Sequence, residues 1–121
     1  MQASYDIGYQ VITMDEYNKL GHEKCSKMIL DRLGDNPIYV TFDLDCLDPT
    51  VAPGVANIES AFRGFNMDEA RKLLQSLKGR NVIGGDVACL MPTKDSPNNI
   101  TSMVAAAVMF EIICLISLNL K

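Results

Sequence analysis

The chain has 121 residues, a length that suits one domain with a single core. Apolar residues make up 48 % of it and charged residues 21 %, a composition that excludes an intrinsically disordered chain. The net charge of −4 comes without a cluster of Lys and Arg, which excludes a nucleic-acid-binding surface, because phosphate contacts need such a cluster.

The first predicted elements are a strand and a helix. Residues 8–13 (GYQVIT) form a short strand-like run. Thr13 with Glu16 three residues later is a capping box, which predicts a helix from there to about Leu33. Gly21 weakens the middle of this helix, and a glycine follows its last residue, as is common at helix C-termini.

The middle of the chain predicts a strand, a long loop and a second helix. Residues 38–43 are rich in β-branched and aromatic side chains and predict the strand. The loop over 47–65 holds two prolines and two glycines, and loops of this length in compact domains are usually functional. Asn66 and Glu69 form another capping box, which predicts a helix that stops at Gly79.

The last third predicts a strand and a helix. Residues 81–91 are an apolar run whose paired glycines allow close backbone approach. Ser96 and Pro97 are expected as N-cap and first residue of the final helix. Residues 100–120 carry one charged side chain and are long enough to span a bilayer. Their alanines and polar interruptions, without a flanking Lys/Arg cluster, favour a buried core helix and no membrane contact.

Three strands that alternate with three helices predict an α/β fold, a three-layer αβα arrangement with a mostly parallel sheet and right-handed crossovers. Three strands are few for such a sheet, because both of its faces and both of its edges need cover. We therefore expect residues 1–121 to be part of a domain.

The four cysteines are widely spaced and form no CxxC pair, so neither a zinc knuckle nor a disulfide framework is indicated. A reduced, cytoplasmic setting is expected. The first ten residues have neither the basic start nor the apolar stretch of a signal peptide.

Acidic residues follow the strand predicted over 38–43. Asp43 and Asp45 are expected at the carboxyl end of a parallel strand, where ligands bind in such sheets. Alternation along the strand would point both carboxylates to the same side, where they repel each other unless a divalent cation neutralises them. Oxygen ligands favour Mg²⁺, Mn²⁺ or Ca²⁺. Asp48 is expected to brace the loop through nearby backbone amides. The simpler interpretation is a polar strand end with an Asx turn.

Two families end an apolar strand in this way. The stretch YVTFDLDCLD resembles the hhhhDxDGT motif of haloacid dehalogenase-like phosphatases, but Cys46 and Leu47 replace its glycine and threonine. The later GDxxxD motif of that family would need an acid at Leu90. The phosphatase is therefore the weaker match.

The stretch TFDLDCLDPTVAPG at 41–54 closely resembles the ureohydrolase signature [ST]-x-D-x-D-x-x-D-P-x-x-A-P-G, that of the arginase and agmatinase family. The resemblance continues in NVIGGDVACLMPTKD at 81–95, which is similar to V-x-G-x-D-x-x-E-x-x-P-x-x-D, and favours the agmatinase or guanidino-acid hydrolase branch. It implies hydrolysis of a small guanidino compound to urea and an amine by a hydroxide that bridges two Mn²⁺ ions.

The resemblance also implies roles for single residues. Asp43 would bridge both manganese ions, Asp45 would bind one of them, and Asp48 would support these ligands from outside the coordination sphere. Cys89 stands where many members carry a glutamate that binds the substrate guanidinium, and a thiol supplies that charge at neutral pH only if its pKa is strongly lowered. A nucleophilic Cys89 is the lesser alternative, because no histidine accompanies it.

The remaining ligands of the family come from GGDH and DAHxD segments, and this sequence contains neither. GGDV at 84–87 lacks the histidine, and the single histidine, His22, is expected at the surface or the edge of the core. Glu59 and Arg63 are loop charges that could contact a substrate or a neighbouring subunit. The resemblance thus implies the C-terminal portion of one ureohydrolase domain, over 1–121, from a homo-oligomeric enzyme. The alternative is an inactive truncated homologue that acts as a binding or regulatory partner.

Overall fold

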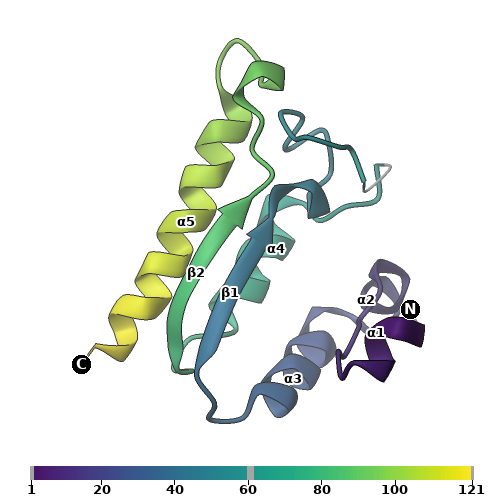
Figure 1. Cartoon of the computed structure of the whole chain (residues 1–121), viewed down its shortest axis with the longest axis vertical. Helices are drawn as coiled ribbons and strands as arrows, with labels where there is room; N and C mark the ends of the chain where they lie inside the picture. The colour runs from purple at the N-terminus through teal and green to yellow at the C-terminus, as the bar shows by residue number, and fades with distance from the viewer. Residues whose placement is uncertain (1, 60–61, 121) are drawn as a thin grey trace.

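The computed structural model describes residues 2–59 and 62–120 (Figure 1). Two parallel strands lie beside helices, so the α/β class with parallel strands is confirmed. The elements in chain order are α1 (Gln2–Asp6), α2 (Met14–Leu20), α3 (His22–Leu33), β1 (Ile38–Asp43), the 3₁₀ turn η1 (Leu44–Cys46), α4 (Met67–Gln75), β2 (Val82–Ala88), the 3₁₀ turn η2 (Pro92–Lys94) and α5 (Ile100–Asn119).

Strand β1 pairs with β2 in parallel from Ile38↔Val82 to Asp43↔Ala88, with an irregularity after Ile38. The side chains of β1 alternate between the two faces of the sheet. Ile38 is buried, whereas the next residue, Tyr39, is 62 % exposed. The predicted strand over 38–43 is confirmed, and its bounds agree with the prediction.

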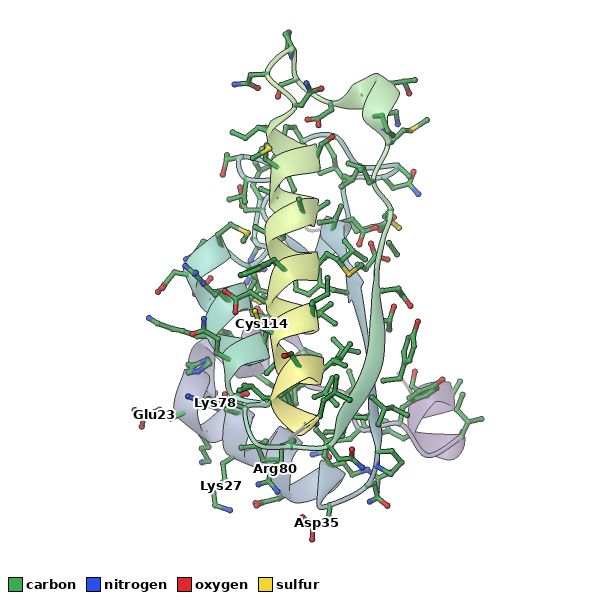
Figure 2. All side chains as sticks on the ribbon, turned by 90° about the vertical axis from the view of Figure 1, so that its left-hand side faces the viewer. Glu23, Lys27, Asp35, Lys78, Arg80 and Cys114 are labelled. Carbon is green, nitrogen blue, oxygen red and sulfur yellow. The ribbon has the colours of Figure 1, made fainter. Side chains whose placement is uncertain are left out.

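The main core lies on one face of the sheet, under α4 and α5 (Figures 1 and 2). Gly85 lets α5 approach closely, because a Cβ there would lie 2.7 Å from Ile112 Cγ2 and 2.6 Å from the Val40 carbonyl oxygen. On the opposite face, Ile83 is 61 % exposed, so the described residues supply one of the two predicted helical layers. The buried members of this core are Ile38, Leu74, Leu77, Val82, Val108, Ile112 and Leu115.

The N-terminal prediction is wrong in two respects. Residues 8–13 are not a strand, since the described chain offers them no strand to pair with. The helix predicted from Thr13 to Leu33 is divided at Gly21, whose φ of 83° and ψ of 161° end α2 and start α3. The break leaves the Tyr17 ring edge-on to Phe65, with 4.9 Å between the ring centroids.

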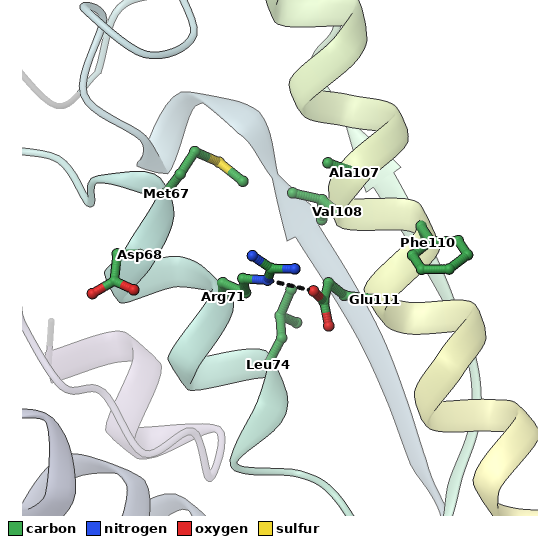
Figure 3. Close-up of a pocket in the computed structure, with 8 residues that line it drawn as sticks. All are labelled: Met67, Asp68, Arg71, Leu74, Ala107, Val108, Phe110 and Glu111. Carbon is green, nitrogen blue, oxygen red and sulfur yellow. Dashed lines mark hydrogen bonds and ion pairs between the residues drawn. The ribbon is translucent and has the colours of Figure 1, made fainter.

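Helix α4 begins as predicted, and it is joined to α5 by an ion pair. The Asn66 side chain accepts from the Glu69 amide at 2.9 Å, and the Glu69 carboxylate accepts from the Asn66 amide at 2.9 Å. Arg71 Nε donates to Glu111 Oε1 at 2.6 Å across a cavity of about 310 Å³ between the two helices (Figure 3). Glu111 is the one charged residue of α5, and the ion pair with Arg71 balances its charge.

Helix α5 begins later than predicted, at Ile100 rather than beside Ser96 and Pro97. Ser96 and Pro97 instead lie in a turn closed by the Asn99 amide on the Ser96 carbonyl at 2.8 Å. The Asp95 carboxylate accepts from the amides of Thr101 at 3.0 Å and Ser102 at 2.9 Å, so an acid five residues before the helix caps its first turn.

One face of α5 is buried against β2 and the other is exposed. Val108 and Ile112 are 1 % and 0 % exposed, whereas Met103 and Phe110 are 68 % and 65 % exposed. The predicted core helix is therefore buried on one side. By length and composition α5 would also suffice to cross a membrane.

Candidate metal centre

The acidic end of β1 continues into the 3₁₀ turn η1. Asp43 is the last residue of the strand, and its Oδ1 accepts from the Asp45 amide at 3.3 Å. Asp45 therefore lies in the turn, and the explanation that alternation along one strand brings the two carboxylates together is wrong. Capping of the turn by Asp43 brings them together instead.

Buried apolar side chains hold this turn in place. Leu44 and Leu47 are 0 % and 2 % exposed and belong to a second core cluster under the long loop. Gly64 passes against the turn so closely that a Cβ would lie 2.5 Å from the Leu47 carbonyl carbon. Hydrogen bonds from the Phe65 amide to the Cys46 carbonyl, at 3.0 Å, and from the Asp48 amide to the Phe65 carbonyl, at 2.9 Å, tie the two segments together.

Cys89 reaches the same place from β2. The parallel register sets Asp43 beside Ala88, so the next residue, Cys89, leaves the sheet beside the acids. Its φ of 67° lies in the left-handed region, and its carbonyl accepts from the Ala56 amide at 3.3 Å. One ligand atom from each of Asp43, Asp45 and Cys89 lies within 4.8 Å of the others.

The mutual proximity of these groups disfavours their charged forms. Burial, followed by the charge of Asp43, raises the pKa of Asp45. A hydrogen bond to Asp43, together with burial and the two negative charges, raises the pKa of Cys89 to about 11. The raised pKa favours the neutral thiol at pH 7, so the structure gives no support to the alternative of a nucleophilic thiolate.

Two other residues considered from the sequence lie outside this cluster. Asp48 Oδ1 accepts from the Thr50 amide at 2.9 Å, which is the predicted Asx turn, so its support of a metal stays a prediction. His22 is half-buried at the start of α3, as expected, with its ring nitrogens 3.3 Å from the hydroxyls of Tyr17 and Ser26.

A cleft of about 500 Å³ opens beside Asp45. Asp15 and Glu59 add carboxylates to its lining, and Arg63 Nη2 donates to Asp15 Oδ1 at 2.6 Å. Three acids and one arginine give the cleft an acidic character that suits a small cationic ligand.

Two residues that position the site were not singled out from the sequence. Thr101 Oγ1 accepts from the Gly54 amide at 2.8 Å, and a Cβ on Gly54 would lie 2.8 Å from the Asp95 Cα. The sequence signal for these contacts was the ends of the two motifs, APG at 52–54 and PxxD at 92–95. Both ends meet at the first turn of α5.

The donor set of the cluster fits one divalent cation. Two carboxylates and a thiol supply three donors, and no described histidine joins them. Carboxylate and water ligands suit Mn²⁺, and two ions need more ligands than these three residues supply. The residues described here therefore do not fit a pair of manganese ions on their own.

The chain is similar to known proteins over most of its length. The chain is 36 % identical to an agmatinase from Photorhabdus laumondii over 91 % of its length, and 35 % identical to putative agmatinase 3 of Schizosaccharomyces pombe over 89 %. It covers 35 % and 26 % of those two proteins, so the chain spans about a third or less of these curated relatives.

Solved structures show the same fold. A proclavaminate amidino hydrolase from Streptomyces clavuligerus matches 98 % of the chain with a TM-score of 0.90 and 28 % identity, over 39 % of that structure. A hypothetical agmatinase from Burkholderia thailandensis matches 90 % with a TM-score of 0.81 and 33 % identity, over 33 % of that structure. The arginase family model matches residues 1–115, and the chain therefore belongs to the arginase family of ureohydrolases.

Proposed function

We propose that this chain is the part of a guanidino hydrolase that carries Asp43 and Asp45, and that the complete protein releases urea and an amine from a small guanidino compound of the agmatine or guanidino-acid type. The single observation that carries the proposal is the carboxylate pair at the carboxyl end of β1, in a fold that matches an amidino hydrolase with a TM-score of 0.90. Relatives named agmatinases support the same substrate class.

The acidic cleft supports a guanidinium substrate. A guanidinium is a planar cation with several N–H donors, and carboxylates are its usual partners. Asp45 and Glu59 border the cleft and are close enough that the charge of Glu59 raises the pKa of Asp45. We propose that Glu59 helps to attract the substrate, while Asp43 and Asp45 bind manganese together with ligands from outside the described residues.

The test is reconstitution of activity. The chain is mixed with a separately produced N-terminal portion of an agmatinase and Mn²⁺, and urea release is measured with agmatine and with guanidino acids. We expect urea only from the mixture, and we expect the D43N/D45N double variant to release none. The D35N variant is the control, because Asp35 is fully exposed at the opposite end of β1 (Figure 2).

Urea release by D43N/D45N equal to that of D35N would contradict the proposed role of the pair. If the wild-type mixture shows no urea with any guanidino compound, although the two parts associate, the hydrolase proposal fails for this chain.

A second candidate function is that of an inactive partner of a complete ureohydrolase. The exposed sheet face favours it, because Tyr39 and Ile83 are 62 % and 61 % exposed on two neighbouring strands. In that case the chain would copurify with a complete agmatinase and change its activity without releasing urea. An I83K variant would lose the association, whereas D43N/D45N would keep it.

A further inference from the structure

We propose that Thr101 is a positioning residue: its hydroxyl, in the first turn of α5, holds the loop over 54–56 against the segment over 89–91 and so fixes the backbone that presents Cys89 to the substrate. The inference rests on the proposed function, because it concerns how the guanidino hydrolase binds its substrate. It goes beyond that function, because Thr101 belongs neither to the carboxylate pair nor to the lining of the acidic cleft.

The Thr101 hydroxyl bonds to a loop that is distant in the sequence. A threonine inside a helix commonly bonds to a carbonyl of its own preceding turn or points to solvent. Thr101 is 0 % exposed, and its Oγ1 instead accepts from the Gly54 amide, 47 residues earlier, at 2.8 Å. Gly54 is buried as well, and a buried amide without a partner is costly. The hydroxyl therefore gives the loop a specific anchor that an apolar side chain of the same size lacks.

The anchored loop pairs with the segment after β2 through an isolated antiparallel bridge. The Met91 amide donates to the Gly54 carbonyl at 2.8 Å. On the other side of the bridge, the Ala56 amide donates to the Cys89 carbonyl at 3.3 Å. The φ of 67° at Cys89 is a conformation that residues other than glycine seldom adopt unless surrounding contacts impose it. These bonds therefore determine how Cys89 is presented.

The first turn of α5 is itself fixed, so the anchor is rigid. The Asp95 carboxylate accepts from the amides of Thr101 at 3.0 Å and Ser102 at 2.9 Å. Further along the same helix, Ile112 is fully buried in the main core. The backbone position of Cys89 thus depends on the core through α5, over a path of hydrogen bonds that begins at Thr101.

The bridge lies at the edge of the proposed substrate site. The ligand atom of Cys89 lies within 4.8 Å of those of Asp43 and Asp45. The anchored loop continues to Glu59, which borders the acidic cleft. Because this loop carries neither member of the carboxylate pair, its displacement should weaken substrate binding more than it slows the reaction of bound substrate.

Amide hydrogen exchange of the whole chain tests the anchor. Thr101→Val removes the hydroxyl and keeps the shape of the side chain, so the Gly54 amide loses its acceptor. We expect the amides of Ala56 and Met91 to exchange about tenfold faster than in the wild type, while the amide of Ile112 keeps its rate. Unchanged rates at Ala56 and Met91, or an equal acceleration at Ile112, would overturn the proposal.

Two matched variants serve as controls. Thr101→Ser keeps the hydroxyl, and Ser102→Ala removes the neighbouring hydroxyl, which donates to Asp95 Oδ2 at 2.8 Å. Both should leave the exchange of the Ala56 and Met91 amides within about twofold of the wild type. If Ser102→Ala accelerates these amides as much as Thr101→Val does, a weaker cap of α5 is sufficient to free the loop, and the specific role of Thr101 is refuted.

Gly54→Ala tests the same contact from the loop side, and it decides the question if Thr101→Val does not fold. A Cβ on Gly54 would lie 2.9 Å from Thr101 Oγ1, so the loop has to move away from the hydroxyl. The amides of Ala56 and Met91 should again exchange faster than in the wild type. Wild-type rates at both amides would overturn the proposal.

Kinetics of the reconstituted mixture separate positioning from a general loss of stability. With agmatine, Thr101→Val should raise KM about tenfold and change kcat by less than about twofold, and Thr101→Ser should keep the wild-type KM. A merely structural role would lower the folded fraction, and with it kcat, at an unchanged KM, and that result would overturn the proposal. Absence of urea from the wild-type mixture counts against the proposed function only, because amide exchange needs no substrate. Faster exchange with an unchanged KM refutes only this inference.

Discussion

The two ends of the sheet differ in what holds them together. At the amino end, Ile38 and Val82 are buried beneath α4 and α5 in an apolar core. At the carboxyl end, the same strands finish in Asp43 and Cys89, and two carboxylates lie within reach of a thiol. Burial raises the pKa of Asp45 at this end, so the charges there oppose folding instead of supporting it. The comparison shows that apolar packing below the site, through Leu44 and Leu47, offsets a polar arrangement kept for binding.

The largest expected effect comes from removing that packing. Leu44→Ala should lower the free energy of unfolding by about 2–5 kcal/mol, because it empties a fully buried site. It should also weaken metal binding, since Leu44 lies between Asp43 and Asp45. Ile112→Ala, at the equally buried contact with Gly85, should cost a similar amount and leave metal affinity in the folded fraction unchanged. Urea unfolding and Co²⁺ titration check both variants; equal losses of metal affinity would show that the two core regions are not separate.

The next effect concerns the cap of α5. Burial raises the pKa of Asp95, but hydrogen bonds from Ser102 and Thr101 outweigh this and hold it well below its usual range. A lowered folded-state pKa means that Asp95 stabilises the protein above its unfolded pKa, and that this contribution is lost as pH falls toward the folded value. Asp95→Asn should lower the unfolding midpoint by roughly 5 °C at pH 7 and by less at pH 3. Thermal unfolding at both pH values measures this, and an equal loss at both would rule out the charge as the cause.

A smaller effect of opposite sign is expected at the carboxylate pair. Because the folded-state pKa of Asp45 is raised, its ionised form destabilises the metal-free protein at pH 7, and protonation removes this cost as pH falls through the folded pKa. Asp45→Asn should therefore raise the thermal midpoint of the metal-free chain by one or two degrees, and the gain should shrink at pH 4. The same variant should bind Co²⁺ more weakly. A lower midpoint for metal-free Asp45→Asn would contradict the view that the pair opposes folding.

The smallest effect is expected at the molecular surface, on α3. Lys27 and Asp31 form an ion pair on α3 with side chains 73 % and 64 % exposed. Lys27→Ala should change the free energy of unfolding by less than about 0.5 kcal/mol, because solvent screens such pairs. Urea unfolding at low and high salt checks this, and a loss above 1 kcal/mol would show that α3 depends on charge rather than on its apolar contacts.

Local signals predicted the elements that depend on local physics. The strand over 38–43 and the capping box at Asn66 need only neighbouring residues, and both are confirmed. Residues 8–13 have strand-like composition but no partner strand in the described chain, which sequence pattern alone does not show. Gly21 breaks a helix because its backbone takes a conformation that most residues avoid. The pattern of apolar residues gives no sign of this break, because it continues on both sides of Gly21.

The candidate site was predicted in part. The motif located Asp43 and Asp45, but the turn that joins them was missed, because strand alternation seemed sufficient. Cys89 lies 46 residues from Asp43 and meets it only through the parallel register of β1 and β2, which no local pattern encodes. The family was predicted correctly, since two long motifs with fixed spacing are more specific than any single pair of acids.

The ion pair between Arg71 and Glu111 has a consequence for how α5 sits on the sheet. Apolar side chains lie on both the buried and the exposed side of this helix, so its hydrophobic pattern alone does not select the face that is buried. The ion pair of Glu111 with Arg71 of α4, at 2.6 Å, adds a polar contact that favours one rotation of the helix, because turning α5 would move Glu111 away from its counterion. The rotation of the final helix is therefore set by this ion pair together with the contact of Ile112 with Gly85 and the hydrogen bond between Thr101 and Gly54.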